Sequence, residues 1–309
     1  MEDLVMCTGM SVLDVPIRGL ASIDPESESN PAEFVGLNLG GDAVNEAVVL
    51  TKLGVNVQLY TAFTDDNAGK TIRMLLEEEG VNVSRSEFIP GKDSNISVPI
   101  VFADAERVFV AGRKEDPILA FKPDPSKIEG AKVVTLASLY SKPYDDVESA
   151  YRMAKAAKEQ GSIVCADLTY QISRGNLDTY KDVWPYVDYF FPNDTEAQLL
   201  TGETDPERMA DVLLSYGIKN AIVKIGKRGC LFKNAEECFI VPPHLVEPKD
   251  TTGAGDNFCA GFICGLIEGK DHRECCRYAN ATASICIQYD GASTGVKSRE
   301  QLQEVLDNY

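Results

Sequence analysis

One stretch of the chain combines residue types that can hold an anion and accept a proton. It runs from Asp250 to Phe262 and reads DTTGAGD before a helical pattern of apolar residues. Three of its residues have little or no side chain: Gly253, Ala254 and Gly255. Their backbone N–H groups are free to face a ligand, and a helix start adds positive partial charge, so the stretch predicts an anion hole suited to a phosphate.

Asp256 follows directly after this expected anion hole. A carboxylate beside a bound phosphate can accept the proton of an attacking hydroxyl. Its reference pKa of about 3.9 would keep it ionised at neutral pH. An acidic residue in the first turn of a helix is also favourable on its own, so spacing alone leaves both interpretations open.

Alternating strands and helices are expected to position these residues. Strand patterns cover 55–60, 131–136, 162–167, 187–191 and 221–225, and helical patterns cover 69–79, 145–160, 195–201 and 252–266. Continuous apolar strands that alternate with helices predict an α/β fold, with a doubly wound, mostly parallel sheet flanked by helices. No linker or repeat interrupts the pattern, so we expect a single domain over 1–309.

Two segments, 10–38 and 97–114, alternate like strands without a helix between them. In the second segment, apolar alternation over 98–102 and 108–110 flanks a polar turn at 104–106, which predicts a β-hairpin. We expect the two segments to form a small β-sheet lid on the main domain.

Composition excludes several classes of function. The net charge is −18 and the pI is about 4.6, so broad affinity for nucleic acid or an anionic membrane is not expected. No apolar run reaches the roughly 20 residues of a membrane helix, and the acidic N-terminus lacks the positive flank of a signal peptide. The chain has nine cysteines without a C-x-x-C pair and only two histidines. This predicts buried, reduced thiols in a cytoplasmic protein and no multi-histidine zinc site.

The sequence matches parts of two nucleotide-binding motifs but completes neither. Gly253-Ala254-Gly255 begins a G-x-G-x-x-G pattern, but Phe258 takes the third glycine position. Gly69-Lys70-Thr71 resembles the end of a P-loop, but Thr64 replaces its first glycine and two carboxylates, Asp65 and Asp66, would repel phosphates. The second stretch is better interpreted as a polar turn that begins a helix.

From Asp250 to Ile263 the sequence resembles the C-terminal signature of the ribokinase-like (PfkB) carbohydrate kinases. The resemblance implies the ribokinase-like fold and ATP-dependent transfer to a sugar hydroxyl. It also implies that Asp256 is the catalytic base and that the backbone of Gly253, Ala254 and Gly255 stabilises the transferred phosphoryl group.

The N-terminal half resembles the sugar-binding part of the same family. Gly40, Gly41 and Asn45 match its G-G-x-x-x-N motif, and Asp14 matches its sugar-binding Asp. Paired glycines let a polyol approach the backbone, and Asn45 offers a donor and an acceptor. An ordinary turn and a capping Asp are the alternatives. Thr64 departs from the glycine of the family's pattern. Arg113, beside the predicted hairpin, could meet an acidic sugar or remain a solvated edge charge.

The nucleotide side of the resemblance lies further along the chain. Asn193 and Glu196 match an N-x-x-E element that organises Mg²⁺, largely through water, and phosphate. A single Glu is chemically adequate for Mg²⁺, and a helix N-cap is the alternative. The resemblance places Lys224, Gly226 and Gly229 near the ATP phosphates and Asn280 beside the adenine. It also implies a monovalent-cation site, at which backbone carbonyls hold K⁺; the matching positions are Asp250, Thr252, Cys286, Tyr289, Gly291 and Gly295.

We therefore expect an ATP-dependent kinase for a small carbohydrate. A fructose-like hexose is favoured over ribose, because 137–140 lacks the acidic residue that ribokinases carry there. A keto-deoxy sugar acid ranks second and a nucleoside third, since no apolar shelf for a base is apparent. A non-catalytic sugar or nucleotide sensor on the same fold is the opposing class, against which Asp256 argues. The resemblance also implies a homodimer formed through the lid sheet.

Overall fold

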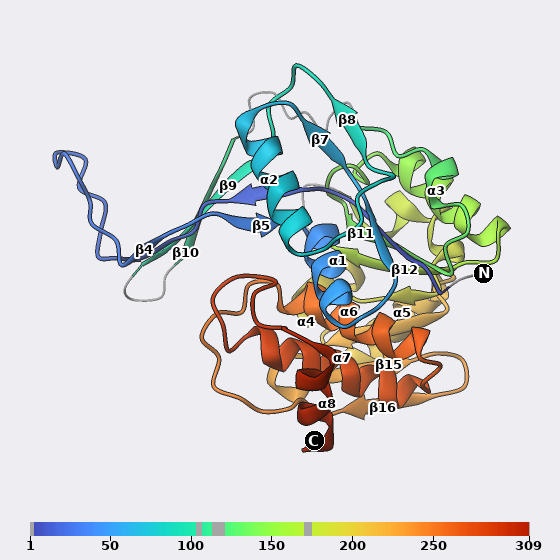
Figure 1. The fold of residues 1–309 in the computed structure, drawn as a ribbon. Helices are drawn as coiled ribbons and strands as arrows, with labels where there is room; N and C mark the ends of the chain where they lie inside the picture. Colours follow the sequence, from blue (N-terminus) through green and yellow to red (C-terminus); the bar gives the residue numbers. More distant parts are fainter. Residues whose placement is uncertain (1–2, 103–106, 113–120, 170–174, 309) are drawn as a thin grey trace.

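The computed structural model describes residues 3–102, 107–112, 121–169 and 175–308. Its main sheet has eight strands in the order β16-β15-β14-β13-β12-β11-β1-β6 (Figure 1). These are β1 (Val5–Thr8), β6 (Val57–Tyr60), β11 (Val133–Leu139), β12 (Ile163–Leu168), β13 (Tyr189–Phe190), β14 (Asn220–Lys224), β15 (Cys230–Lys233) and β16 (Cys238–Val241). The strands from β6 to β14 in this order pair in parallel, whereas β15 and β16 pair antiparallel at one edge. The predicted mostly parallel sheet is confirmed.

Helices cover both faces of this sheet because its strands are apolar on both sides. In β1, Val5 and Cys7 belong to one buried apolar cluster and Met6 to the other. The first cluster includes residues of α1 (Asp42–Lys52), α2 (Asn67–Glu78), α6 (Ala254–Ile267), α7 (His272–Cys286) and α8 (Arg299–Asp307). The second includes residues of α3 (Val147–Glu159), α4 (Asp194–Thr201) and α5 (Pro206–Ser215). The doubly wound arrangement is therefore confirmed.

A second sheet projects from the main body, as Figure 1 shows. Its strands are β2 (Val12–Asp14), β3 (Ile17–Leu20), β4 (Phe34–Val35), β5 (Asn38–Gly40), β9 (Ile96–Phe102) and β10 (Arg107–Ala111). They follow the order β4-β3-β9-β2-β5, with β10 paired antiparallel to β9 as a hairpin requires. We call this sheet the lid sheet. The expected turn at 104–106 lies outside the described residues.

Several elements were not predicted from the sequence. The β7 (Ala62–Thr64) and β8 (Glu87–Ile89) strands form a separate parallel pair, and α1, α5 and α8 were not anticipated. Short 3₁₀ turns, η2 (Pro125–Ile128), η4 (Leu177–Tyr180), η5 (Trp184–Tyr186) and η6 (Gly226–Arg228), complete the described elements. The α1 helix follows the Gly40-Gly41 pair, whose turn chemistry hid the helix in the pattern.

All nine cysteines are free thiols, and eight of them are buried as expected. Cys238, on the edge strand β16, is exposed, which corrects that expectation for one residue. No helix within the described ranges has the length and apolar character that crossing a membrane requires.

Candidate active site

Asp256 lies in the first turn of α6, where it meets α1. The Asn45 side-chain amide donates to Asp256 Oδ2 at 2.7 Å. The carboxylate is only partly buried, so it remains reachable from solvent. The α1 and α6 helices pack against each other, and this contact joins the sugar motif to the C-terminal signature. The structure therefore brings together two predicted residues that are 211 positions apart in the sequence.

The start of α6 is open. Its N-cap, Gly253, has φ 76°, and no side chain caps the helix in the described part of the chain. The Ala254 amide donates to the Thr251 carbonyl at 3.3 Å, whereas no protein acceptor among the described residues takes the amides of Gly255 and Asp256. The free donors are thus shifted by one residue from the expected set. Unpaired amides at a helix start are an anion site.

Two glycines at the start of α6 are closely approached by other parts of the chain, and Gly253 is the more restricted of the two. A Cβ on Gly253 would lie 2.5 Å from backbone atoms of Ala292, and its positive φ disfavours other residues. A Cβ on Gly255 would lie 3.1 Å from Lys224 Nζ. The bare Cα of Gly255 therefore lets the lysine ammonium approach the cradle. Phe258, which broke the dinucleotide motif, is buried and contacts Phe191 edge to face.

Lys224 ends β14 and forms a buried ion pair with Asp167, at the end of β12. Lys224 Nζ lies 2.9 Å from Asp167 Oδ2 and 3.1 Å from Oδ1. Burial alone would lower the pKa of Lys224, but the Asp167 carboxylate, with Cys259 and Glu196, holds that pKa above its ordinary value. Lys224 is therefore a permanent positive charge beside the cradle, and Asp167 fixes its position.

Carboxylates crowd this part of the molecule and raise one another's pKa. Burial and then the Asp42 carboxylate raise the pKa of Asp256 well above its ordinary value, although the Asn45 amide lowers it. Burial also raises the pKa of Asp42, against the hydrogen bond from Ser138. The reference pKa of about 3.9 is therefore too low for Asp256 in the folded protein. A raised pKa makes Asp256 a stronger proton acceptor when it is ionised.

The predicted sugar residues gather where the lid sheet meets the main domain. Asp14 ends β2, Gly40 ends β5, and Gly41 is the N-cap of α1 with φ 98°. A pocket here is lined by Asp14, Pro16, Arg18, Asn38, Leu39, Pro99, Ile100, Val101, Phe109, Thr252, Gly291 and Ala292. Burial raises the pKa of Asp14 to about 6, with a hydrogen bond from Ser97 lowering it and Asp42 raising it. Arg113 lies outside the described residues.

Asn193 and Glu196 form a reciprocal capping box at the start of α4. The Asn193 side chain accepts from the Glu196 amide at 2.8 Å, and Glu196 Oε2 accepts from the Asn193 amide at 2.8 Å. Burial raises the pKa of Glu196 to about 7, while Lys224 lowers it and Asp167 raises it. Oε1 has no partner within the described ranges, so this Glu fits Mg²⁺ held largely through water. Both interpretations of the motif can hold together.

The remaining nucleotide residues surround the turn after β14. Gly226 and Gly229 flank η6 with φ of 56° and 89°. Asn280, on α7, donates to the carbonyls of Val241 at 3.2 Å and Pro242 at 3.0 Å. Its amide therefore fixes the chain after β16, and its predicted place beside an adenine remains a prediction.

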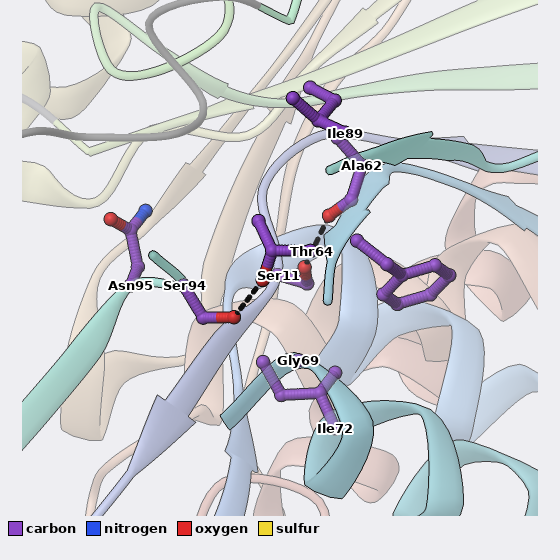
Figure 2. A pocket seen from close by; sticks show the side chains of 9 residues that line it. Ser11, Ala62, Thr64, Gly69, Ile72, Ile89, Ser94 and Asn95 are labelled. Carbon is purple, nitrogen blue, oxygen red and sulfur yellow. Dashed lines mark hydrogen bonds between the residues drawn. The ribbon is translucent and has the colours of Figure 1, made fainter. Parts of the chain in front are cut away.

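The P-loop-like stretch is closed by its own side chains. At the start of α2, Asp66 Oδ1 accepts from the Gly69 amide at 2.7 Å and from the Ser94 hydroxyl at 2.7 Å. Figure 2 shows Thr64 and Ser94 hydrogen-bonded in the pocket beside it, with Ser11 bonded to Ala62. A carboxylate thus takes the place that a phosphate would need, as the sequence indicated.

Sequence reasoning missed three charged residues of the site. Asp42, directly after Gly41, accepts hydrogen bonds from the hydroxyls of Ser138 and Thr169. Asp167 holds Lys224, and Arg18 lines the pocket beside Asp14. Asp167 had a usable signal, because a polar residue that ends a buried parallel strand lies at the sheet edge where ligands bind. Arg18 had none, because its partners are distant in the sequence.

Known proteins match this chain along almost its full length. The model of the pfkB family carbohydrate kinases matches residues 3–299. Ribokinase of Haemophilus influenzae is 25% identical over 275 residues, which cover 87% of each chain. The 2-dehydro-3-deoxygluconokinase of Bacillus subtilis is 27% identical over 292 residues, covering 87% of this chain and 86% of that protein. "Probable fructokinase-4" of Arabidopsis thaliana is 26% identical over 284 residues, covering 86% and 87%.

A solved structure agrees with these sequence relatives. The structure of Arabidopsis thaliana ribokinase complexed with ribose and ATP superposes with a TM-score of 0.84 at 25% identity, covering 98% of each chain. With the family model spanning nearly the whole sequence, the chain belongs to the PfkB family of carbohydrate kinases, which are phosphotransferases with a hydroxyl group as acceptor.

Proposed function

We propose that this protein transfers the γ-phosphoryl group of ATP to a hydroxyl of a small neutral sugar. One observation carries the proposal: the Asp256 carboxylate accepts a hydrogen bond from Asn45 at a helix start with free amides, and Lys224 Nζ lies beside Gly255 at the same helix start. A proton acceptor, an anion hole and a fixed cation are thus gathered at one place. A sugar or nucleotide sensor would need the pocket but not the acceptor.

The chemical step follows from these contacts. The sugar hydroxyl oxygen attacks the γ-phosphorus, its proton passes to Asp256, and the bond between the γ-phosphorus and its bridging oxygen breaks to release ADP. The amides of Gly255 and Asp256 and the ammonium of Lys224 stabilise negative charge on the transferred oxygens. Mg²⁺, when bound through Glu196 and water, would neutralise charge on the ATP phosphates.

The charge of the pocket favours a neutral sugar. Asp14 contributes a carboxylate to the pocket, and Asp42 and Asp256 add two carboxylates near the start of α6. The guanidinium of Arg18, which also lines the pocket, is already paired with Asp250 and Asp290. A sugar acid would meet repulsion from the described residues. We keep a fructose-like hexose as the first candidate. Ribose is tested as well. Segment 137–140 lacks an acidic residue of its own, but the Asp42 carboxylate is hydrogen-bonded to Ser138 and supplies an acid beside this segment.

A nucleoside is the second candidate, on a specific observation. Pro99, Ile100 and Phe109 of the lid sheet line the pocket, and together they form the apolar wall that the sequence did not reveal. An aromatic ring in such a wall can stack on a base. The rest of the proposed machinery would act unchanged on a ribose hydroxyl of the nucleoside.

A panel of acceptors tests the proposal. ADP release is measured with D-fructose, D-ribose, a nucleoside and 2-keto-3-deoxygluconate, and the phosphorylated product is identified by ³¹P NMR. We expect release that depends on one of the neutral acceptors and that Asp256→Asn abolishes. Release that ignores every acceptor and the substitution would refute the assignment, and binding of a sugar without any release would favour the sensor.

We also propose a homodimer formed through the lid sheet. Apolar side chains are exposed on this sheet at Phe34, Val35, Val108, Phe109 and Val110. Several exposed apolar side chains on one sheet are a feature of surfaces that contact another protein. Sedimentation of the wild type and of Val35→Glu tests it: we expect a dimer that the charge dissociates, and a monomeric wild type would refute it.

The nine free thiols support a cytoplasmic location as part of the same proposal.

A further inference from the structure

Arg18 joins the lid sheet to both loops that shape the start of α6. It lies on β3, and its Nη2 donates to Asp250 Oδ2 at 2.6 Å. Its Nη1 donates to Asp290 Oδ1, also at 2.6 Å. The Arg18 side chain is 17% exposed and that of Asp250 is 3% exposed, so the first contact is shielded from solvent. One guanidinium thus links three segments that are distant in the sequence.

The Asp250 carboxylate has no position left for another positive partner. An ionised carboxylate offers about four lone-pair sites. Oδ1 accepts from the Thr252 amide at 3.0 Å and from the Thr252 hydroxyl at 2.7 Å. Oδ2 accepts from the Gly291 amide at 3.1 Å and from Arg18 at 2.6 Å. A cation could reach this carboxylate only if Arg18 withdrew.

The carbonyl oxygens expected at a potassium site also have donors. The Thr252 carbonyl accepts from the Cys286 thiol at 3.5 Å, and the Cys286 carbonyl accepts from the Tyr289 amide at 3.1 Å. The Gly295 carbonyl accepts from the Gln301 side chain at 3.3 Å. Each carbonyl keeps a second lone pair, so hydrogen bonding alone does not exclude an ion. Charge decides the question, because the Asp250 carboxylate that would balance a cation is already paired with the Arg18 guanidinium, which would repel one. The residues as arranged do not fit a potassium ion at Asp250.

The same contacts fix the anion hole. Gly253, the N-cap of α6, packs directly on Ala292, and the Asn257 side-chain amide donates to the carbonyls of both residues, at 2.8 and 2.6 Å. Asp250 lies three residues before Gly253, and Asp290 lies two residues before Ala292. Because Arg18 binds both carboxylates, it helps to hold the two loops together, alongside the ion pair of Lys249 with Asp290 and the hydrogen bond from the Gly291 amide to Asp250.

We infer that the Arg18 guanidinium takes the place of a monovalent cation at Asp250, and that it positions the anion hole so that this protein needs no potassium. Arg18 is a positioning residue, because it acts on the phosphoryl group through the loops. The inference rests on the proposed function for its consequence in catalysis. Its structural half, the occupied Asp250 site, stands independently and can be tested without any substrate.

The first measurement is thermal unfolding in KCl and in tetramethylammonium chloride at equal ionic strength. We expect the same Tm for the wild type in both salts. Arg18→Met frees one lone-pair site of Asp250, so its Tm falls in tetramethylammonium and rises again with K⁺. Arg277→Met, which removes an arginine paired with Glu274 on α7, is the matched control and gains nothing specific from K⁺.

The second measurement is sugar-dependent ADP release in the same salts. We expect wild-type kcat to differ by less than about twofold between them, and Arg18→Met to lose about tenfold or more in kcat, with part of it restored by K⁺. KM for ATP should change less than kcat, because Arg18 touches no substrate phosphate. Arg18→Lys keeps the charge but not the two-pronged contact, so we expect it to fall between the two.

Two results would overturn the inference. A wild-type Tm or kcat that rises specifically with K⁺ shows a cation bound despite Arg18, and an Arg18→Met protein that is fully active without K⁺ shows that Arg18 positions nothing. If Arg18→Met does not fold, the Tm and kcat of the wild type and of Arg18→Lys in the two salts still test the inference. If no acceptor supports ADP release, the proposed function fails, while the unfolding series still tests the Asp250 site.

Discussion

The starts of α2 and α6 share small and acidic residues, reading TDDNAG at α2 and DTTGAGD at α6. They differ in what occupies their free amides. At α2, the Asp66 carboxylate accepts from the Gly69 amide and from the amide and hydroxyl of Ser94. At α6, no described side chain caps the helix, and a lysine ammonium lies at the Cα of Gly255. A helix start binds a phosphate only where the protein has left its donors unused.

The pKa values of the carboxylates at the two helix starts shift in opposite directions, because the two carboxylates differ in their hydrogen bonds. Burial would raise the pKa of Asp66, but hydrogen bonds from Ser94, Gly69 and Thr64 outweigh it and lower that pKa below its ordinary value. Burial and the Asp42 carboxylate raise the pKa of Asp256, and the Asn45 amide only partly opposes them. The start of α2 stabilises the ionised form of Asp66, whereas Asp256 at the start of α6 takes up a proton readily.

Removing the proton acceptor at the open start should have the largest effect. We expect Asp256→Asn to lower kcat by about 10³-fold, the scale of a lost general base, because an amide cannot accept the hydroxyl proton. The Tm should change little, since the amide keeps the shape of the side chain. Glu274→Gln is the matched control, because Glu274 is likewise the third residue of its helix, α7. Equal losses in both variants would contradict the role of Asp256.

Adding a side chain at Gly255, at the start of α6, should have the next largest effect. Gly255→Ala places a Cβ about 3.1 Å from Lys224 Nζ and displaces the ammonium, so we expect kcat to fall by about 10- to 100-fold. Gly69→Ala is the counterpart at α2, where the Cβ would meet the Thr64 carbonyl at 2.5 Å. That variant should lose stability and keep its kcat. A reversed pattern would show that α2 is the phosphate site.

A buried acid beside the open site should make stability depend on pH. Glu46 is 1% exposed, and burial, with Asp167 and Asp42, raises its pKa to about 8. Its folded pKa exceeds the unfolded value near 4.5, so stability falls as pH rises from about 4.5 to 8, by at most about 1.4 kcal/mol per unit.

Glu46→Gln removes this dependence, and chemical unfolding across the pH range measures it. We expect the variant to match the wild type below about pH 4.5 and to become the more stable protein as pH approaches 8. Glu78→Gln, at an exposed position on α2, is the matched control and should change nothing with pH. A stability difference between Glu46→Gln and the wild type that stays constant with pH would contradict the raised pKa of Glu46.

Opening the closed start should have the smallest effect. Asp66→Ala removes the N-cap of α2, and we expect a loss of about 1 kcal/mol in the free energy of unfolding. The kcat should stay at the wild-type value, because the proposed active site does not include α2. The stabilisation by Asp66 is present above about pH 3.8 and is lost as pH falls, which is the opposite sign to Glu46. A large loss of kcat would show that the two starts cooperate.

The local parts of the site were predictable from the sequence, and the long-range parts were not. Asp256 and its glycines lie within seven residues, and turn and helix chemistry decides their arrangement there. The contacts from Asp42 to Ser138 and from Arg18 to Asp250 span 96 and 232 positions, and no pattern in the sequence records them. The sequence predicts no strand after the turn at Gly226 and Gly229, whereas the structure has the antiparallel edge strands β15 and β16 there.

The most direct test of the central claim compares the two helix starts in one complex. ¹⁹F NMR of the protein with MgADP, tetrafluoroaluminate and the accepted sugar observes fluorines that stand in for the oxygens of the migrating phosphoryl group. We predict that Gly255→Ala shifts or removes the fluorine resonances, whereas Asp66→Ala leaves them unchanged. Resonances that move with Asp66→Ala and ignore Gly255→Ala would contradict the account.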